Sequence, residues 1–432
     1  MALNFKQFNK ISNNPWSYVM NDKDNPYGVE EYFDTGCLML NAAMSDGDIQ
    51  KGCVLGKKYC FSGESSTGKS LFCAYQVKQF LDSDPNAMVL IFETEGSSTK
   101  EMFEQIGVDM SRVKVEPVNI IEDLQTIALK YMTDIEEDYL ETKERTKLML
   151  VVDSLGMLVS KKEADDVAMA KDVRDMTRAQ AIKKFFRLIT LKLALLKIPM
   201  LTVNHTYTNI GGYGDSQVES GGSGFMYAGD VRFLLTKSQK KTGNVQTGIS
   251  IKVKIKKSRF VKENQSFIID IDWEKGLNKY SYMVEMADAV GMLKATDSKV
   301  IFEGNEYGRT MFEEKFGEFF TGEKLQTLRK RIKTELTFGA DDNIDAMNID
   351  KLVAAGIKFG LIQDTARTII LPDGVKIKKN DLRANEDLIP EELLDQIKAK
   401  LIEEKENKEV KSNNEEGLEE NEELNGEPNQ NE

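Results

Sequence analysis

The chain has 432 residues, more than one ordinary domain requires, so we expect one large α/β core with smaller appendages. No run of about 18 apolar residues occurs, and the first residues lack a basic region followed by an apolar one, which argues against membrane-spanning and secreted classes. We therefore expect a cytoplasmic protein with no membrane contact. The four cysteines (Cys37, Cys53, Cys60 and Cys73) form no C-x-x-C pair and lack histidine partners, because the only histidine of the sequence is His205, so we interpret them as reduced core thiols.

The net charge of −13 is concentrated at one end of the chain. Residues 403–432 contain twelve Glu and three Lys, a net charge of −9, which leaves −4 for the other 402 residues. This acidic tail has too few apolar residues to offset the entropy of ordering, so we predict that it is disordered. The body is nearly neutral, and basic strips that bind nucleic acid remain compatible with its composition.

The first segment, residues 1–35, shows no sustained helical or strand period. It is rich in Asn, Asp and the aromatic residues Phe5, Phe8, Trp16, Tyr18 and Tyr27. We interpret it as an N-terminal oligomerisation arm that packs on a neighbouring subunit.

Residues 36–285 alternate apolar runs with helical segments, which predicts a core with a mostly parallel central sheet covered on both faces. The expected buried strands are Tyr59–Ser62, Met88–Phe92, Leu148–Val152 and Pro199–Val203. Three later segments lie closer together and alternate, so we expect them to extend the sheet with antiparallel strands. They are Val231–Thr236, Ile249–Lys257 and Ser266–Asp272.

A phosphate-binding loop follows the first of these strands and opens a helix. It reads Gly63-Glu64-Ser65-Ser66-Thr67-Gly68-Lys69-Ser70. Glycines allow the tight curvature, backbone N–H groups form an anion nest, and the helix N-terminus adds positive potential. We predict that Lys69 binds the β- and γ-phosphates of ATP and that Ser70 is a ligand of Mg²⁺. The alternative is an ordinary glycine-rich turn.

Acidic residues end two of the predicted strands. Asp153 closes the run that starts at Leu148, which is where P-loop proteins hold magnesium. Glu93 and Glu95 end the strand that starts at Met88, and one of them is placed to activate water for hydrolysis. Strand alternation turns both the same way and therefore does not choose between them; the alternative is a solvated acidic turn.

Residues 286–402 contain two stretches with the same pattern. In each, a short helix reaches a glycine, Gly291 or Gly360, and a predicted β-hairpin follows. A basic amphipathic helix around Leu325–Thr334 separates them. We expect a small α+β C-terminal domain made of two related wing-like units.

Several short motifs recur in a fixed order. Asp153-Ser154 closes the acidic strand, Ile106-Gly107-Val108-Asp109 follows the glutamate strand, Val203-Asn204-His205 ends a later strand, and a glycine-rich loop runs to Ser220-Gly221-Gly222-Ser223-Gly224. In this order they resemble the RecA-type recombinases. Four stretches look most like the UvsX recombinases of large tailed phages: Asp153-Ser154-Leu155-Gly156, Ser160-Lys161-Lys162-Glu163, Asp175-Met176-Thr177-Arg178-Ala179 and Asn204-His205-Thr206-Tyr207. The resemblance covers roughly residues 36–275.

The resemblance implies roles around the phosphates. Glu95 matches the catalytic glutamate of the family, which activates water. His205 stands where RecA has a glutamine that senses the γ-phosphate and relays its presence to a DNA-binding loop. Met102 or Phe103 occupies the region that contacts adenine, with plain core packing as the alternative.

Two segments match the DNA-binding loops of the family, from about Leu158 to Met176 and from about Thr206 to Gly224. In the second loop the resemblance points to Tyr207, Asn209, Tyr213, Gly221 and Gly222. Near the first loop the candidate cations are Lys161, Lys162, Lys171, Arg174 and Arg178. Acidic residues are interspersed among them, so the alternative is a solvated helix face.

Lys257 and Arg259 end a lysine-rich strand. They match two cations that, in RecA-type filaments, reach the γ-phosphate of the neighbouring subunit. The alternative is a charged edge strand protected from aggregation.

The resemblance implies a RecA-like P-loop ATPase core in a DNA-dependent ATPase that forms ATP-bound filaments on single-stranded DNA. Such a protein pairs that strand with homologous double-stranded DNA in recombination, repair and recombination-dependent replication. The implied partners are both forms of DNA, further copies of the chain, and a recombination mediator and single-strand-binding protein of the same phage, in the cytoplasm of the infected cell. The alternatives are a hexameric replicative helicase and an ATP-switched DNA-binding scaffold.

Overall fold

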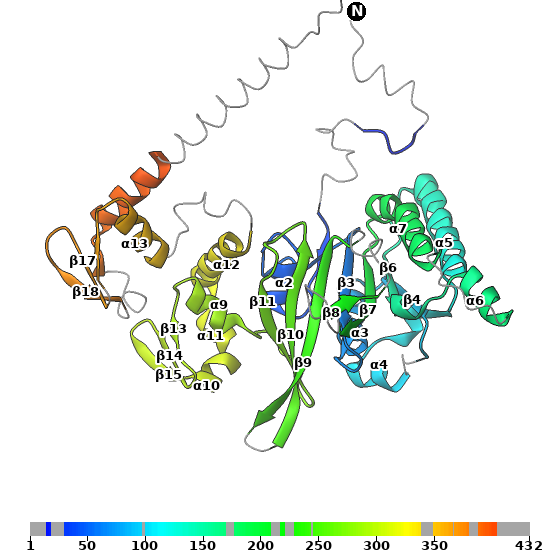
Figure 1. Cartoon of the computed structure of the whole chain (residues 1–432), viewed down its shortest axis with the longest axis horizontal. Helices are drawn as coiled ribbons and strands as arrows, with labels where there is room; N and C mark the ends of the chain where they lie inside the picture. The colour runs from blue at the N-terminus through cyan, green and yellow to red at the C-terminus, as the bar shows by residue number, and fades with distance from the viewer. Residues whose placement is uncertain are drawn as a thin grey trace, which may run out of the picture. The chain divides into compact units, whose positions relative to one another are not determined.

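The computed structural model divides the chain into two units, Met1–Tyr282 and Met283–Glu432, each described here by itself (Figure 1). The structure describes residues 14–18, 30–96, 100–169, 177–208, 217–220, 229–242, 245–337, 349–365, 367–379 and 388–403. The sequence places the boundary between core and C-terminal domain three residues later. Most of the predicted arm and all but Glu403 of the predicted acidic tail lie outside the described residues.

A ten-stranded sheet forms the core of the first unit, in the order β12-β11-β10-β9-β3-β7-β6-β4-β5, with β8 paired to β7. The parallel part comprises β3 (Lys58–Gly63), β7 (Met200–Thr208), β6 (Leu148–Asp153), β4 (Met88–Glu93) and β5 (Val113–Pro117). Apart from Met88, the apolar runs of β3, β4, β6 and β7 are buried, as the sequence predicts for parallel strands, whereas Val115 of the edge strand β5 is 45% exposed. The predicted α/β fold with a mostly parallel central sheet is thus confirmed.

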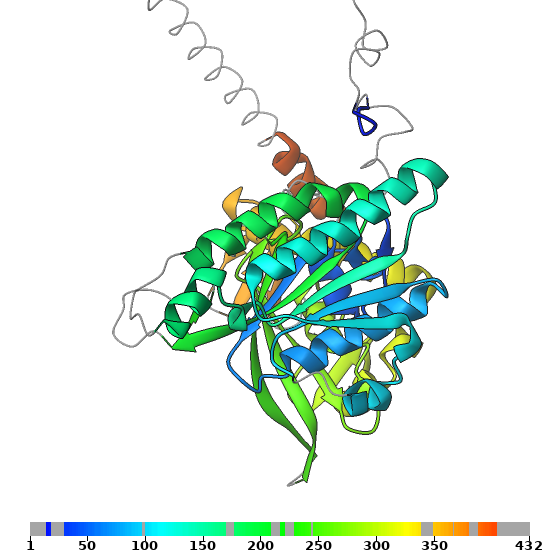
Figure 2. The ribbon, with the colours of Figure 1, turned by 90° about the vertical axis from the view of Figure 1, so that its right-hand side faces the viewer.

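Helices cover both faces of this sheet (Figure 2). The helices are α3 (Lys69–Ser83), α4 (Lys100–Ile106), α5 (Ile121–Thr142) and α7 (Thr177–Leu196), whereas α6 (Lys161–Ala168) has no buried residue and contacts α7. On one face, α5 and α7 pack over Cys60, Phe92 and Val152. On the other face, Phe61 stacks on Phe233 and meets Phe72 of α3 edge-on. Alternate residues of β3 therefore serve opposite layers.

The antiparallel extension is also confirmed. It contains β9 (Val231–Thr242), β10 (Val245–Ser258), β11 (Ser266–Asp272) and β12 (Gly276–Leu277). β9 runs parallel to β3, with Leu235 opposite Gly63, and continues as a long hairpin with β10 beyond the end of β3 (Figure 1). The lysine-rich β10 lies between β9 and β11, so the alternative of an edge strand is wrong.

The ends of the core are closed by short elements. β1 (Tyr32–Phe33) pairs with β2 (Cys53–Val54), and α2 (Leu38–Met44) lies between them in sequence. From the arm, the structure describes Asn14–Tyr18, where Trp16 stacks on Tyr139 of α5 at 5.2 Å between ring centroids.

All four cysteines are buried and free, as predicted. Burial raises the pKa of Cys37 to about 11 and that of Cys60 to about 12, so both stay protonated at neutral pH.

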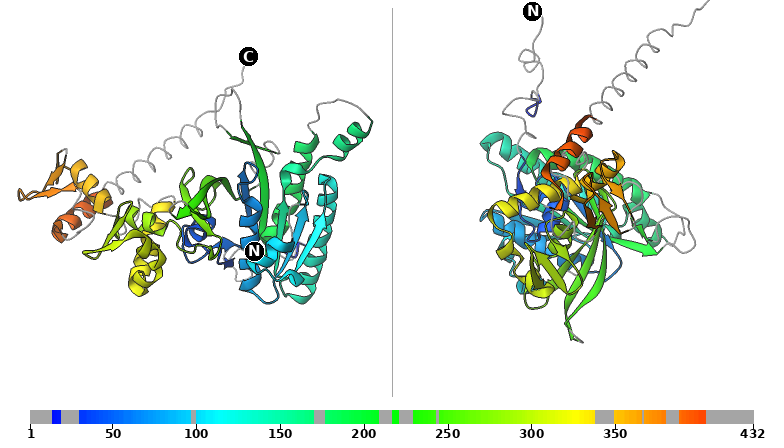
Figure 3. Two further views of the ribbon diagram at one scale, coloured as in Figure 1. Left: turned by 90° about the horizontal axis from the view of Figure 1, so that it is seen from below. Right: turned by 90° about the vertical axis from the view of Figure 1, so that its left-hand side faces the viewer.

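The second unit contains the two related modules that the sequence predicts (Figure 3). The first has α9 (Met283–Ala289) and the sheet β13 (Lys294–Ala295), β14 (Lys299–Phe302) and β15 (Asn305–Gly308), followed by α10 (Arg309–Glu314), α11 (Phe316–Phe319) and α12 (Gly322–Leu336). The second has α13 (Ile349–Lys358), the sheet β16 (Gln363–Asp364), β17 (Thr368–Ile370) and β18 (Lys376–Lys378), and a helix over 391–403. Gly291 and Gly360 follow the first helix of each module at φ of +72° and +71°, a conformation that favours glycine.

In the described part of the chain, no helix is both long enough and apolar enough to span a membrane.

Candidate active site

The phosphate-binding loop joins the carboxyl end of β3 to the first turn of α3. Gly68, at φ of +87°, supplies the left-handed turn before the helix starts at Lys69. The Lys69 ammonium is buried and donates to the backbone oxygens of Gly63 at 3.0 Å and Glu64 at 2.6 Å. Burial lowers the pKa of Lys69, although the carboxylates of Glu95 and Asp153 act to raise it. A cation is thus held over the loop, where phosphate oxygens can replace the two carbonyls.

Ser70 and Asp153 form the expected pair for a magnesium ion. Their side chains are hydrogen-bonded, and only 4% of Asp153 is exposed. Burial raises the pKa of Asp153 to about 6; the Ser70 hydrogen bond opposes this rise, and Glu93 and Glu95 add to it. A divalent cation would stabilise the ionised form of this buried carboxylate, and both side chains offer the oxygen ligands that Mg²⁺ prefers. The residues present therefore fit the ion.

Two carboxylates that strand alternation leaves equivalent have different surroundings. β4 ends at Glu93, so alternation no longer governs Glu95. Glu93 is buried and its Oε1 accepts from the backbone N–H of Glu95 at 2.9 Å. Glu95 Oε1 accepts from the Ser154 hydroxyl and lies 2.7 Å from His205 Nε2.

The pKa of Glu95 favours its ionised form. Burial raises this pKa, but hydrogen bonds from Ser154 and His205, together with the charge of Lys69, bring it below its ordinary value. A carboxylate beside a P-loop that is ionised at neutral pH can orient and deprotonate water. Glu95 is exposed at the end of the strand and Glu93 is buried, so Glu95 is the better placed candidate for the catalytic base.

Thr94 locks the ends of β4 and β6 together, and sequence reasoning missed it. Its hydroxyl accepts from the N–H of Ser154 at 2.8 Å and donates to the backbone oxygen of Ser154 at 2.9 Å. Its own N–H donates to the backbone oxygen of Asp153 at 2.9 Å. A threonine between two glutamates carries no sequence signal for this role, because the partner is 60 residues away.

His205 stands between the nucleotide site and the second loop. Strand register places it opposite Gly63 of the P-loop strand. β7 then continues to Thr208, where β8 (Gln217–Glu219) pairs with it antiparallel, so the chain leaves the sheet from the histidine's own strand and returns on the strand paired with it. Glu219 accepts from the Ser62 hydroxyl at 2.6 Å and pairs with Arg232, which ties the loop's returning strand to β3 and β9.

The predicted DNA-contacting residues are only partly described. Lys161 and Lys162 are exposed in the first turn of α6, and Lys161 pairs with Asp123 at 3.1 Å. Tyr207 is 59% exposed. Arg178 turns inward and donates to the backbone oxygen of Gly156. The candidates Lys171, Arg174, Asn209, Tyr213, Gly221 and Gly222 lie outside the described residues.

Exposed apolar side chains border both loops, which the sequence reasoning also missed. Near the first loop they are Met157 at 50%, Val167 at 73% and Met169 at 64% exposure, and near the second Val218 at 45%. Exposed apolar side chains that gather beside two candidate binding loops are typical of interaction surfaces. Only their exposure in the folded chain distinguishes them from core residues.

Lys257 and Arg259 lie at the other end of β3. Lys257 Nζ donates to the backbone oxygen of Gly229 at 2.9 Å, and Arg259 Nε lies 3.3 Å from Asp230 Oδ1. Asp230 also accepts from the backbone N–H of Lys58 at 2.9 Å. Gly63 lies five residue steps along β3 from Lys58, on the order of 17 Å. Both cations are thus held by contacts at the end of β3 opposite the P-loop of their own chain.

The two candidate adenine contacts occupy α4. Phe103 is 7% exposed and packs in the core, which favours the packing alternative for this residue. Met102 is partly exposed.

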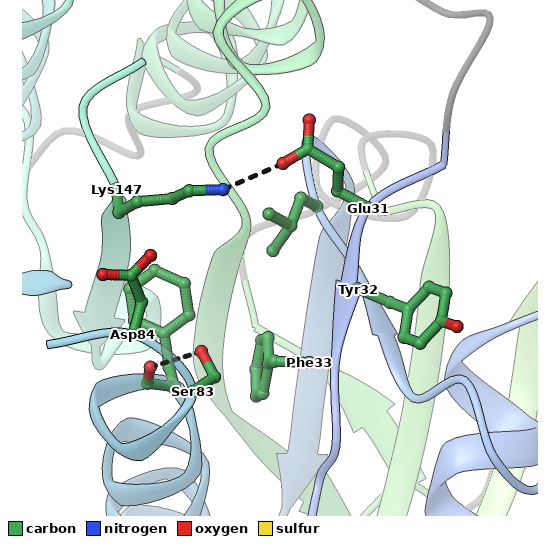
Figure 4. Close-up of a pocket in the computed structure, with 8 residues that line it drawn as sticks. Glu31, Tyr32, Phe33, Ser83, Asp84 and Lys147 are labelled. Carbon is green, nitrogen blue, oxygen red and sulfur yellow. Dashed lines mark hydrogen bonds and ion pairs between the residues drawn. The ribbon is translucent and has the colours of Figure 1, made fainter. Parts of the chain in front are cut away.

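A pocket elsewhere on the first unit is distinct from this site (Figure 4). Its lining includes Glu31 and Phe33 from the segment around β1, Asp84 after α3, and Lys147 before β6. The Glu31 carboxylate pairs with Lys147 at 2.9 Å. Since Lys147 precedes β6, the pocket lies at the amino ends of the parallel strands, whereas the P-loop follows a carboxyl end.

The sequence matches the RecA N-terminal domain family over residues 6–278. It is 32% identical over 301 residues to the recombination and repair protein of Enterobacteria phage T4, covering 69% of this chain and 72% of that protein. It is 23% identical to the RecA protein of Bifidobacterium breve over 80% of this chain and 84% of that protein, and 23% identical to that of Mesomycoplasma hyopneumoniae (strain 7448) over 63% and 77%. Because the family model matches residues 6–278, more than half of the chain, the chain belongs to the RecA family.

Proposed function

We propose that the chain is a DNA-dependent ATPase that forms filaments on single-stranded DNA and exchanges strands with homologous duplex. The observation that carries the proposal is the contact between Glu95 and His205 at 2.7 Å. It connects the candidate base for ATP hydrolysis to the strand that leads directly into the second loop. A movement of Glu95 that depends on the bound nucleotide therefore also moves the strand from which the second loop starts.

In this proposal each residue of the site has a defined task. Lys69 leaves its two carbonyl partners to bind phosphate oxygens. Ser70 and Asp153 would hold Mg²⁺, which when bound would offset negative charge on the phosphates. Glu95 orients the attacking water and accepts its proton. Thr94 and Ser154 keep Glu95 and Asp153 at a fixed separation.

The second catalytic element comes from a neighbouring subunit. Lys257 and Arg259 make their contacts at the end of β3 opposite their own P-loop, so they serve the nucleotide of the next copy in a head-to-tail filament. This is the logic of an arginine finger supplied in trans, and it makes turnover depend on assembly. Residues 1–35 are proposed as the arm that supports this assembly.

DNA binding is assigned to the two loops. Tyr207 and the exposed apolar residues provide stacking surfaces, and Lys161 and Lys162 provide charge. The relatives are named a recombination and repair protein and RecA, and these names agree with single- and double-stranded DNA as partners of this chain. A mediator and a single-strand-binding protein of the same phage remain proposed partners.

The hexameric helicase alternative is not favoured, because the whole core matches RecA proteins. The scaffold alternative requires ATP binding without turnover, and the ionised Glu95 argues against it.

The test compares Glu95→Gln with Glu101→Gln, an exposed residue of α4. We expect the Glu95 variant to bind ATP and single-stranded DNA normally while losing turnover by about 100-fold, as removal of a general base does. The control should match the wild type. Wild-type turnover that does not rise with single-stranded DNA, or a Glu95 variant with full turnover, contradicts the proposal.

A further inference from the structure

Arg178, in the first turn of α7, is turned toward the protein interior. Its Nη2 donates to the backbone oxygen of Gly156, lies 3.2 Å from Ser220 Oγ, and has the backbone oxygen of Leu155 at 3.5 Å. The helix gains nothing from a cation at this place, because a helix N-terminus carries partial positive charge. The contacts of Arg178 therefore serve the elements it touches: the turn after β6 and the residue after β8.

Ser220 is held from three directions. Its N–H donates to the backbone oxygen of His205 at 2.9 Å, its backbone oxygen accepts from Asn204 Nδ2 at 2.8 Å, and its hydroxyl lies beside the Arg178 guanidinium. His205 in turn contacts Glu95, and Glu95 accepts from Ser154.

These contacts close a circuit. From Glu95 it runs through His205 and Ser220 to Arg178, and from Arg178 through Gly156 and the preceding two residues of the chain back to Glu95. Arg178 is the only side chain of the circuit that comes from α7, the helix that follows the first loop. One set of hydrogen bonds thus joins the candidate catalytic base to residues on either side of the first loop and to Ser220 of the second.

The contacts are tightly packed at Gly156, and three buried polar atoms of the surrounding side chains make no hydrogen bond in the described part of the chain. A Cβ at Gly156 would lie 3.1 Å from Asn204 Oδ1 and 3.2 Å from His205 Cδ2, so glycine lets the histidine approach the turn. Within the described ranges, Arg178 Nε, Asn204 Oδ1 and Thr206 Oγ1 are buried with no hydrogen-bond partner. Buried polar atoms of this kind favour a rearrangement that satisfies them.

We propose that Arg178 is a positioning residue that couples the nucleotide site to both DNA-facing loops, and that it does not bind a DNA phosphate. The proposal rests on the proposed function. A change in the Glu95–His205 contact moves Ser220, and Arg178 carries the movement to the turn after β6 and to the end of the first loop. Because coupling is reciprocal, DNA bound to the loops acts on the same contact.

The test measures an equilibrium quantity, the ratio of single-stranded DNA affinities of the full chain with and without a non-hydrolysable ATP analogue. A labelled oligonucleotide and fluorescence anisotropy give both affinities over a range of salt. Arg178→Lys keeps the charge but cannot span two acceptors as the planar guanidinium does. We expect it to reduce the ratio by about tenfold, within the usual range of coupling between two sites.

The salt dependence separates coupling from phosphate binding. We expect Arg178→Ala to lower the ratio as well, while the slope of log affinity against log salt stays that of the wild type. A phosphate contact predicts the reverse: a slope lowered by about 0.7 in Arg178→Ala and an unchanged ratio in Arg178→Lys. Either of these results overturns the proposal. Arg187→Lys and Arg187→Ala, exposed on the same helix, are the matched controls and should change neither quantity.

A double-mutant cycle keeps the proposal testable if Arg178→Ala folds poorly. Ser220→Ala removes only a hydroxyl, and we expect Arg178→Lys with Ser220→Ala to lose no more of the ratio than Arg178→Lys alone. Losses that multiply show that the two residues act independently and overturn the proposal. A wild-type ratio of one instead contradicts the proposed function itself, before any variant is compared.

Discussion

Arg259 offers a quantitative test of catalysis across a subunit boundary. Its side chain is 65% exposed, and its partner Asp230 keeps a second ion pair with Lys58 at 2.8 Å. Arg259→Ala therefore leaves no buried charge without a partner and should cost less than about 1 kcal/mol of stability. Since the guanidinium lies on the order of 17 Å along β3 from Gly63, ATP binding by the monomer should be unchanged. Turnover in the assembled protein should fall by about 1,000-fold, as for other arginine fingers.

Mixing two inactive variants shows which subunit supplies the arginine. Arg259→Ala retains Glu95, and Glu95→Gln retains Arg259. In a head-to-tail filament of equal, randomly mixed subunits, about one quarter of the interfaces join an intact Glu95 to an intact Arg259. DNA-stimulated ATP turnover of the mixture should therefore recover to about one quarter of the wild-type value per subunit. If the mixture stays as inactive as its components, Arg259 does not act in trans.

Lys69→Ala should abolish ATP-dependent filament formation, because the buried cation that Lys69 holds over the loop is lost; electron microscopy that finds normal filaments contradicts this. Asp153→Asn should abolish Mg²⁺-dependent turnover yet stabilise the nucleotide-free protein at pH 7.5 by at most about 3 kcal/mol, since burial raises the Asp153 pKa from 3.8 to about 6. The folded protein holds the carboxyl proton of Asp153 more tightly than the unfolded chain does, so the stability advantage of Asp153→Asn over the wild type grows between about pH 4 and 6 and is absent below. Urea unfolding that shows the same stability difference between the two proteins at about pH 4 and 7.5 refutes the assignment. Removing residues 403–432 should raise affinity for single-stranded DNA at low salt, because a tethered chain with a net charge of −9 competes with DNA for basic groups, and an unchanged salt titration would remove the idea.

Elements whose signal is local were predictable from the sequence. The apolar runs that form β3, β4 and β6 are short and bounded by polar turns, and they end in the P-loop glycine or in a carboxylate, whose chemistry can be recognised from the residue type. The same holds for the glycine stops at Gly291 and Gly360, since a left-handed turn needs glycine there whatever surrounds it.

Features that depend on distant partners were not predictable. β7 extends to Thr208 because β8 pairs with it, and β8 has no run of its own that predicts a strand. Arg178 reads as a surface cation in sequence, but its direction is set by acceptors 22 and 42 residues away. Thr94 likewise has no recognisable pattern, because its role exists only after β4 and β6 are adjacent. Tertiary contacts decided these three cases.

The most direct test of the central claim is electron microscopy of the full chain with ATP, Mg²⁺ and single-stranded DNA. We predict helical filaments on the DNA that require ATP and are absent with the Lys69→Ala variant. Closed rings would instead support a helicase, and isolated monomers on the DNA would contradict a site that is completed by a neighbouring subunit.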